Sequence, residues 1–214
     1  TSVTEGLLGV SLCVIISTST QASTMAMQIC DVPGVIRVGE VTLNGNFYTG
    51  DKYVFHKRKL GLDYDANFPK KLKKKHVSLV YILCVNGEIY KIGQSSCGTG
   101  IEGCINFYLN SGTDDPGINR FAINWYMREE LNNGNKVEIY MIYMEPIEVE
   151  VPGLFKFEKM IVPVSAKGIE ENCLMQYNDI EGCYPKWNHQ ETGVALPDHI
   201  HEAFGQYKID RKTK

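Results

Sequence analysis

Several features that would classify a protein at once are missing from this 214-residue chain. No two of its seven cysteines are spaced as Cys-x-x-Cys, which argues against a structural zinc site. The most membrane-like segment, residues 7–16, is too short to span a bilayer. No basic region precedes this segment, so a signal peptide is not expected. Together these absences predict a reduced, cytoplasmic protein with no membrane association.

An excess of positive charge is missing as well, since the formal net charge is -3 and the pI is about 6.0. Proteins that bind nucleic acids non-specifically are usually basic overall, so any contact with DNA must come from a local patch. One such patch is a lysine run that directly precedes an apolar segment, namely Lys70, Lys71, Lys73, Lys74 and Lys75. The run is either a solvated basic loop or a contact for phosphate groups.

Internal repeats and low-complexity tracts are also absent, and 43% of the residues are hydrophobic, enough for one sizeable domain. We expect a strand-rich N-terminal arm over residues 1–76, a core over 77–190 and a polar C-terminal extension over 191–214. The arm carries a hairpin signal at Asn44-Gly45. The extension carries His199 and His201, whose spacing does not place them on one helix face, so a metal role is not favoured.

The core begins with a predicted β-hairpin. An apolar run covers 80–85, a second strand is expected over 88–92, and Asn86-Gly87 between them is a strong signal for a tight turn. Periodicity then predicts helices over 101–109, 118–131 and 166–177, with a strand over 137–144 between the last two. Because strands and helices do not alternate, an α+β fold with a small antiparallel or mixed sheet flanked by helices is expected.

Two tripeptides on this hairpin resemble the motifs that name the GIY-YIG endonucleases. The first is Val80-Tyr81-Ile82, and the second is Lys91-Ile92-Gly93, followed by Gln94-Ser95-Ser96. The segment Pro185-Lys186-Trp187-Asn188 resembles the closing pattern of the family. The resemblance covers roughly residues 77–190 and implies a three-stranded antiparallel sheet packed between helices.

This resemblance implies a Mg²⁺-dependent endonuclease acting on double-stranded DNA, of the phage type or a type II restriction enzyme. A palindromic target would imply a symmetric homodimer. The N-terminal arm and the lysine run would then contribute DNA recognition. An interaction protein whose hairpin matches the motif by chance is the contrasting reading, and it predicts no salt-dependent affinity for duplex DNA.

The resemblance implies catalytic roles for Tyr81 and Lys91. Tyr81 would be the general base, which requires a nearby cation because the pKa of a free phenol is about 10. Lys91 would lower that pKa or orient the attacking water. In a strict two-residue hairpin Tyr90, and not Lys91, shares a face with Tyr81, whereas a bulge reverses this parity. We prefer Lys91 and keep Tyr90 as the alternative.

The next helix departs from the family pattern. Tyr108 matches a motif position, and restriction-type members carry an arginine four residues earlier, where this chain has Cys104. A cysteine cannot hold a phosphate as a guanidinium does. Three explanations remain open: Cys104 is an inactivating replacement, Arg120 supplies the cation, or the chain is a catalytically silent DNA-binding module.

The resemblance implies that Glu171 is the metal ligand, because Leu174, Tyr177 and then the closing segment follow it as in the family pattern. A single carboxylate with several waters suits Mg²⁺. The match to the family pattern does not fix the glutamate to one position of the helix, so Glu170 and the position of Gln176 are alternatives. Asn188 matches the terminal asparagine of the family pattern, and the resemblance implies that it supports the site and contacts the DNA.

Overall fold

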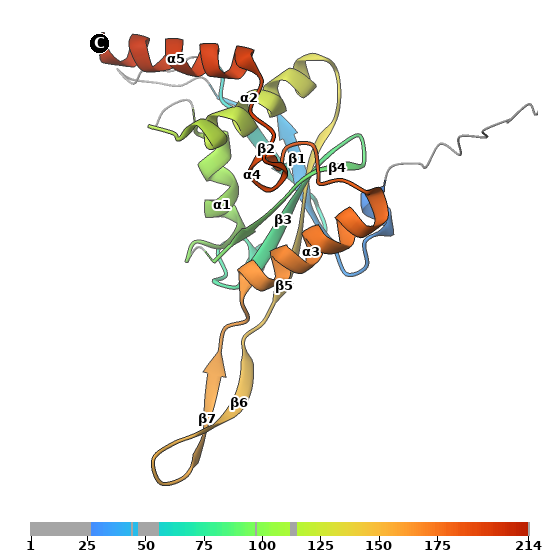
Figure 1. The fold of residues 1–214 in the computed structure, drawn as a ribbon, viewed down its shortest axis with the longest axis vertical. Coiled ribbons are helices and arrows are strands. Elements are labelled where there is room, and N and C mark those ends of the chain that lie inside the picture. Colours follow the sequence, from blue (N-terminus) through green and yellow to red (C-terminus); the bar gives the residue numbers. More distant parts are fainter. Residues whose placement is uncertain (1–26, 44, 47–55, 97, 112–114, 214) are drawn as a thin grey trace, which may run out of the picture.

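A computed structural model describes residues 27–43, 45–46, 56–96, 98–111 and 115–213 of the chain. Its centre is a five-stranded sheet in the order β2-β1-β5-β3-β4, in which every pair of neighbours is antiparallel (Figure 1). The strands are β1 (Ile36–Thr42), β2 (Gly61–Tyr64), β3 (Ser78–Val85), β4 (Glu88–Ser95) and β5 (Val137–Met144).

The predicted hairpin is confirmed as β3–β4. Asn86 and Gly87 both have positive φ values, 51° and 88°, which is the backbone conformation of a tight hairpin turn. All eight residues of β3 are buried, because helices cover both of its faces. The first strand of the hairpin is therefore built into the core, and the second forms the edge of the sheet.

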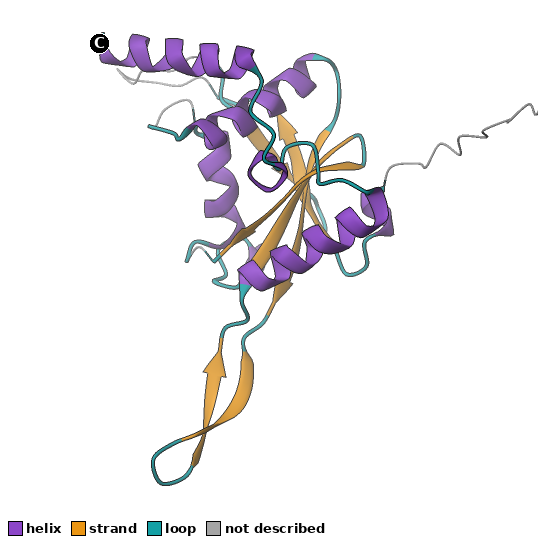
Figure 2. Cartoon of the chain, in the orientation of Figure 1, coloured by secondary structure: helices purple, strands orange, loops and turns teal. Residues whose placement is uncertain are grey.

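Helices lie on both faces of the sheet (Figure 2). On one face, α1 (Gly100–Leu109), α2 (Ile118–Asn132) and α5 (Asp198–Lys212) share a core with the odd-numbered residues of β3. On the other face, α3 (Ala166–Glu181) packs against Val80, Ile82 and Cys84. Short elements are η1 (Ile29–Asp31), η2 (Lys70–Leu72) and α4 (His189–Thr192). Across the part of the chain described, no helix is both long and apolar enough to cross a membrane.

The α+β class is confirmed, and the six elements predicted for the core occur in the predicted order, but the β6–β7 strand pair (residues 147–162) is inserted before the last helix and the expected three-stranded sheet is too small. Two strands from the N-terminal region extend it, since β1 pairs with β5 from Ile36–Met141 to Val41–Val137, and β2 pairs with β1. The N-terminal apolar run at 7–16 and Asn44 of the second hairpin signal lie outside the described residues.

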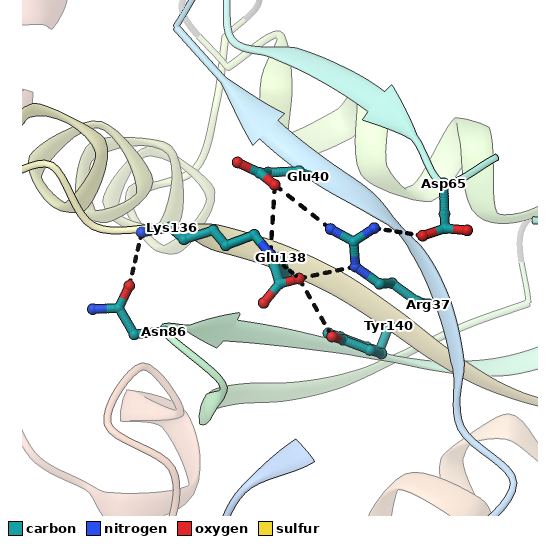
Figure 3. A network of polar contacts seen from close by, with 7 residues as sticks. All are labelled: Arg37, Glu40, Asp65, Asn86, Lys136, Glu138 and Tyr140. Atoms are coloured by element: carbon teal, nitrogen blue, oxygen red, sulfur yellow. Dashed lines mark hydrogen bonds and ion pairs between the residues drawn. The ribbon is translucent and has the colours of Figure 1, made fainter. Parts of the chain in front are cut away.

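A network of charged side chains joins β1 to β5 (Figure 3). The Arg37 guanidinium donates to Glu138 at 2.8 Å and to Asp65 at 2.5 Å, and the Lys136 ammonium lies 2.8 Å from Glu138. Burial alone would raise the pKa of Glu138, but hydrogen bonds from Lys136 and Arg37 outweigh it and lower the pKa. A buried carboxylate that is paired on two sides holds the added strands to the core.

The helix α5 and the strands β6 and β7 were not predicted from the sequence. The C-terminal extension contains α5, whose Ile200 and Tyr207 are buried against the core. Between β5 and α3 lies a second hairpin, β6 (Ile147–Pro152) and β7 (Phe157–Val162), which forms its own two-stranded sheet. Figure 1 shows this hairpin projecting away from the body of the protein.

Candidate active site

The two tripeptides meet across the β3–β4 pair. Tyr81 is the cross-strand partner of Gly93, and its ring lies over that glycine. A Cβ atom at position 93 would come within 2.2 Å of the Tyr81 phenol oxygen and 2.4 Å of Cζ. Only glycine therefore accommodates the Tyr81 ring where it lies.

A β-bulge in β4 decides which residue faces Tyr81. Cys84 pairs with Ile89 and Leu83 pairs with Lys91, so Tyr90 is the extra residue on β4. Beyond the bulge, Lys91 is opposite Leu83 and lies on the same face as Tyr81. In a regular hairpin Tyr90 would share the face of Tyr81. The bulge gives that position to Lys91, which the proposed role of Lys91 requires.

The outer edge of β4 is held by residues 187–188. The backbone N–H of Trp187 donates to the carbonyl of Tyr90 at 2.8 Å. Asn188 accepts from the Ile92 N–H at 2.9 Å and donates to the Ile92 carbonyl at 2.8 Å. The expectation that Asn188 contacts DNA is corrected here: the residue is fully buried and its amide is engaged with Ile92. Its role is to pair with an edge strand that would otherwise expose its backbone.

Tyr81 and Tyr108 form the centre of the site, with their hydroxyl groups 2.5 Å apart. Burial raises the pKa of Tyr81 well above its ordinary value and raises that of Tyr108 to about 12. Both phenols are therefore protonated near neutral pH. The shift of Tyr81 runs opposite to the lowered pKa that a phenolate base requires.

Lys91 shows the complementary shift. Burial lowers the pKa of its ammonium group, and the charges of Glu191 and Glu170 oppose that effect. A lysine with a lowered pKa gives up its proton more readily than a solvated one. Of the groups expected to move protons, Lys91 is the one whose pKa moves toward neutrality.

Cys104 is buried one helical turn before Tyr108 and faces the two phenols. Its side chain lines a pocket of about 250 Å³ together with Tyr81, Tyr108, Gln94 and Ser95. The position at which restriction-type members carry arginine therefore opens into the same pocket as the two tyrosines. In this chain it contributes a thiol and not a fixed positive charge.

Arg120 approaches Tyr108 from a second pocket of about 230 Å³, which Lys91 and His189 also line. Its guanidinium carbon lies 4.2 Å from the centre of the Phe107 ring. The charge of Arg120 acts to lower the pKa of Tyr108, although burial dominates. Tyr108 and Phe107 line both pockets and lie between Cys104 and Arg120.

The neighbouring glutamates of α3 differ in their surroundings. Glu170 is half-buried, accepts a hydrogen bond from the Gln94 N–H, and its charge acts on Tyr81, Tyr108 and Lys91. Glu171 is 65% exposed and pairs with Lys167 at 3.5 Å. Gln176 lines a pocket on the opposite face of the sheet. The preferred ligand Glu171 therefore points away from the tyrosines, and the alternative Glu170 faces them.

A second carboxylate lies near Glu170. Burial raises the pKa of Glu170, and the negative charge of Glu191 raises it further. Among the residues that the structure describes, no group of three or more histidine, cysteine or acidic side chains is gathered as a metal site. A pair of carboxylates suits a hard cation that keeps several waters, as Mg²⁺ does.

His189 was not singled out from the sequence. It follows the Pro-Lys-Trp-Asn segment directly, and its Nε2 lies 3.1 Å from the Tyr126 hydroxyl. Burial and the charge of Lys91 lower its pKa. The signal in the sequence that could have identified it as a site residue was its position directly after that segment.

The lysine run divides into two parts. The ammonium of Lys73 lies over the Tyr64 ring, Lys74 pairs with Glu102 at 3.5 Å, and Lys75 pairs with Glu145. Lys70 and Lys71 are exposed at the surface. Lys70, Lys71 and Lys74, whose side chain is 79% exposed despite its pair with Glu102, are thus the lysines best placed to meet a phosphate group.

No protein-family model matches this chain, and no curated protein matches it significantly. Among solved structures, it is similar to a mutant of bacteriophage T4 EndoII, with 14% identity and a TM-score of 0.43, over 76% of this chain and 99% of that chain. It is also similar to the restriction endonuclease HPY188I in complex with product DNA, with 16% identity and a TM-score of 0.37, over 75% of this chain and 85% of that chain.

Proposed function

We propose that this chain is a DNA endonuclease of the GIY-YIG type, or an inactivated form of one, that hydrolyses phosphodiester bonds with the help of Mg²⁺. The observation that carries the proposal is the bulge at Tyr90. It places Lys91 on the face of Tyr81, while Gly93 makes room for the phenol ring. A regular hairpin with the same residues would separate these two groups.

The pKa shifts suggest roles for the two groups. Tyr81 and Tyr108 remain protonated, so they serve as hydrogen-bond donors to a phosphate oxygen or to the attacking water. Lys91, whose pKa is lowered by burial, would accept the proton of the water or orient it. The phosphate would lie over the pocket that Tyr81, Tyr108 and residue 104 line.

Glu170 would hold the metal ion, with Glu191 as the nearby second carboxylate. A bound Mg²⁺ supplies positive charge for the phosphate oxygens and lowers the pKa of a coordinated water. The raised pKa of Glu170 supports this assignment, because a bound cation would stabilise a carboxylate that burial and a neighbouring charge destabilise. The phosphate backbone of duplex DNA would contact Lys70 and Lys71.

A catalytically silent DNA-binding module is the second candidate. The uncharged Cys104 in the pocket of the phenols favours it, because removal of a guanidinium from a phosphate site removes most of the charge stabilisation there. Arg120 lines a neighbouring pocket and would restore activity only if it reaches past Tyr108.

Plasmid cleavage with Mg²⁺ tests these readings in one panel: the chain as it stands, Cys104→Arg, and Cys104→Arg combined with Glu170→Gln or with Glu171→Gln. We expect Cys104→Arg to cut at least about a hundredfold faster than the unmodified chain. Glu170→Gln should abolish that cutting, and Glu171→Gln, its neighbour on the same helix, should leave it within a factor of about two.

Each other outcome has a definite meaning. Equal cutting with and without the Cys104→Arg change would assign the catalytic cation to Arg120. Loss of activity in Glu171→Gln alone would restore Glu171 as the metal ligand. If neither the chain nor Cys104→Arg cuts, yet both bind duplex DNA with salt-dependent affinity, the endonuclease proposal is wrong and the binding module replaces it.

A further inference from the structure

Two pockets of the candidate site share a wall. Phe107 and Tyr108 of α1 line the pocket of about 250 Å³ that contains Tyr81 and Cys104, and they also line the neighbouring pocket of about 230 Å³. We call these the phenol pocket and the Arg120 pocket. The proposed function places the scissile phosphate over the phenol pocket and assigns no ligand to the Arg120 pocket.

The polar lining of the Arg120 pocket consists of cationic groups and neutral hydrogen-bonding groups. These side chains are Lys91, Arg120, His189, Asn119, Gln190 and Tyr108. Among the described residues that line this pocket there is no aspartate and no glutamate, although the chain as a whole carries a formal charge of -3. Fixed positive charge beside amide and hydroxyl donors is suited to an anion.

Two carboxylates act on the pocket from outside its lining. The negative charge of Glu191 acts on Lys91, and Asp115 interacts with the charge of Arg120. Asp115 is itself paired with two cations of α5, Lys208 and Arg211. Its charge is therefore largely compensated before it reaches Arg120.

The lining is positioned by packing before any ligand binds. The Nε2 atom of His189 lies 3.1 Å from the Tyr126 hydroxyl, and the Trp187 ring stacks on the Tyr126 ring with centroids 5.7 Å apart. The guanidinium carbon of Arg120 lies 4.2 Å from the centre of the Phe107 ring. Because these side chains are already ordered, a ligand would bind without the cost of ordering them.

Phe107 adds a feature that is suited to a nucleotide and not only to a simple anion. Its side chain is 51% exposed, and it lies in the wall between the two pockets. Exposed aromatic rings beside positive charge are surfaces on which nucleic-acid bases stack. The exposed part of this ring would therefore contact the base or sugar of a nucleotide whose phosphate lies in the Arg120 pocket.

We propose that the Arg120 pocket binds the phosphate group next to the scissile one on the same DNA strand, with Arg120 as its main ligand and Phe107 against the nucleotide between them. The inference rests on the proposed function, because a strand that is cut over the phenol pocket continues beyond it. Consecutive phosphates of a strand are joined through one sugar, and two anion pockets with a common wall match that arrangement. Arg120 then holds the substrate and does not act on the scissile phosphate.

An NMR titration of the full chain with thymidine 5′-phosphate, without DNA or Mg²⁺, tests the pocket itself. The chain has two tryptophans, of which Trp187 lines the pocket and Trp125 does not. The indole signal of Trp187 therefore reports binding, and that of Trp125 is an internal reference. We expect the Trp187 signal to shift and saturate below about 20 mM nucleotide. Thymidine, which lacks the phosphate, should produce no comparable shift.

Substitutions at position 120 assign the shift to the pocket. Arg120→Gln should raise the dissociation constant for the nucleotide at least about tenfold, and Arg120→Lys, which keeps the charge, should raise it less. Arg58→Gln is the matched control, because Arg58 is an exposed arginine that lines neither pocket. Equal effects of Arg120→Gln and Arg58→Gln, or no shift of the Trp187 signal, would overturn the proposal. Circular dichroism melts verify that the variants are folded.

Affinity for duplex DNA without Mg²⁺ distinguishes a strand from a free nucleotide as the source of the phosphate. Arg120→Gln should weaken duplex binding about tenfold and lower the slope of log affinity against log salt concentration by about 1, whereas Arg120→Lys should keep the slope. Nucleotide binding that depends on Arg120, with duplex binding that does not, would overturn the assignment to a DNA strand. If no form binds duplex DNA, the endonuclease proposal fails, and the titration still decides whether the pocket binds a phosphate.

Discussion

The chain contains two antiparallel hairpins with opposite surroundings. In β3–β4, every residue of the first strand is buried, and the outer edge of the second is covered by Trp187 and Asn188. In β6–β7, every residue is partly or fully exposed, and the strands pair only with each other. The same backbone pairing thus serves as a rigid support in one place and as a projecting arm in the other.

The difference shows how burial determines the contribution of a contact to stability. A hydrogen bond or a close approach inside β3–β4 has no water to replace it, so its loss leaves a polar group unsatisfied or a clash unrelieved. The equivalent contact on β6–β7 is exchanged for water at little cost. Three substitutions test this contrast, taken from the largest expected effect to the smallest.

Gly93→Ala should have the largest effect. The added Cβ would lie 2.2 Å from the Tyr81 hydroxyl, and that ring is confined by the core and by its bond to Tyr108. We expect the free energy of unfolding, measured by urea denaturation, to fall by about 3 kcal/mol. Gly205→Ala in α5, where an added Cβ meets nothing within 4 Å, should raise it by about 0.5 to 1 kcal/mol. A neutral Gly93→Ala would mean that the Tyr81 ring lies elsewhere.

Asn188→Ala should have the next largest effect. It removes both hydrogen bonds to Ile92 and leaves a buried N–H and a buried carbonyl at the edge of β4. Unfolding free energy should fall by about 2 kcal/mol, and hydrogen exchange of the Ile92 amide should accelerate. Asn106→Ala, at an exposed position of α1, should change stability by less than about 0.5 kcal/mol. An unchanged exchange rate at Ile92 would contradict the role of Asn188 as an edge partner.

Lys159→Ala should have the smallest effect. The Lys159–Glu148 pair is 2.7 Å long, as short as the bonds of Asn188, but its side chains are 67% and 58% exposed. Stability in urea should change by less than about 0.5 kcal/mol. A loss comparable to that of Asn188→Ala would mean that the pair is buried in the folded protein.

Much of the fold could be predicted from the sequence, because local signals were strong. Asn86-Gly87 has the backbone preference of a tight turn, and Asn133-Gly134 lies at the end of α2 as predicted. The helix periodicity identified α1, α2 and the first turns of α3. The β6–β7 hairpin was missed, since it has no Asn-Gly turn. α5 was missed because only two of its residues are buried.

The candidate site was harder to predict from the sequence than the fold. The motif residues Tyr81, Lys91, Cys104 and Tyr108 could be named, but the choice between Lys91 and Tyr90 depended on a bulge that no local pattern marks. The choice between Glu170 and Glu171 depended on the rotation of α3 over the edge of β4. A one-residue step moves a helix side chain by about 100°, so adjacent glutamates cannot be told apart without the packing.

The sequence by itself determined the turn, the periodic elements and the set of reactive residue types, because these depend on contacts between near neighbours in the chain. Only the tertiary structure decided which strand edge Asn188 covers, which glutamate faces Tyr81, and which hairpin remains exposed. Those outcomes depend on which elements pack together across long separations in the chain, and burial there outweighs local preference.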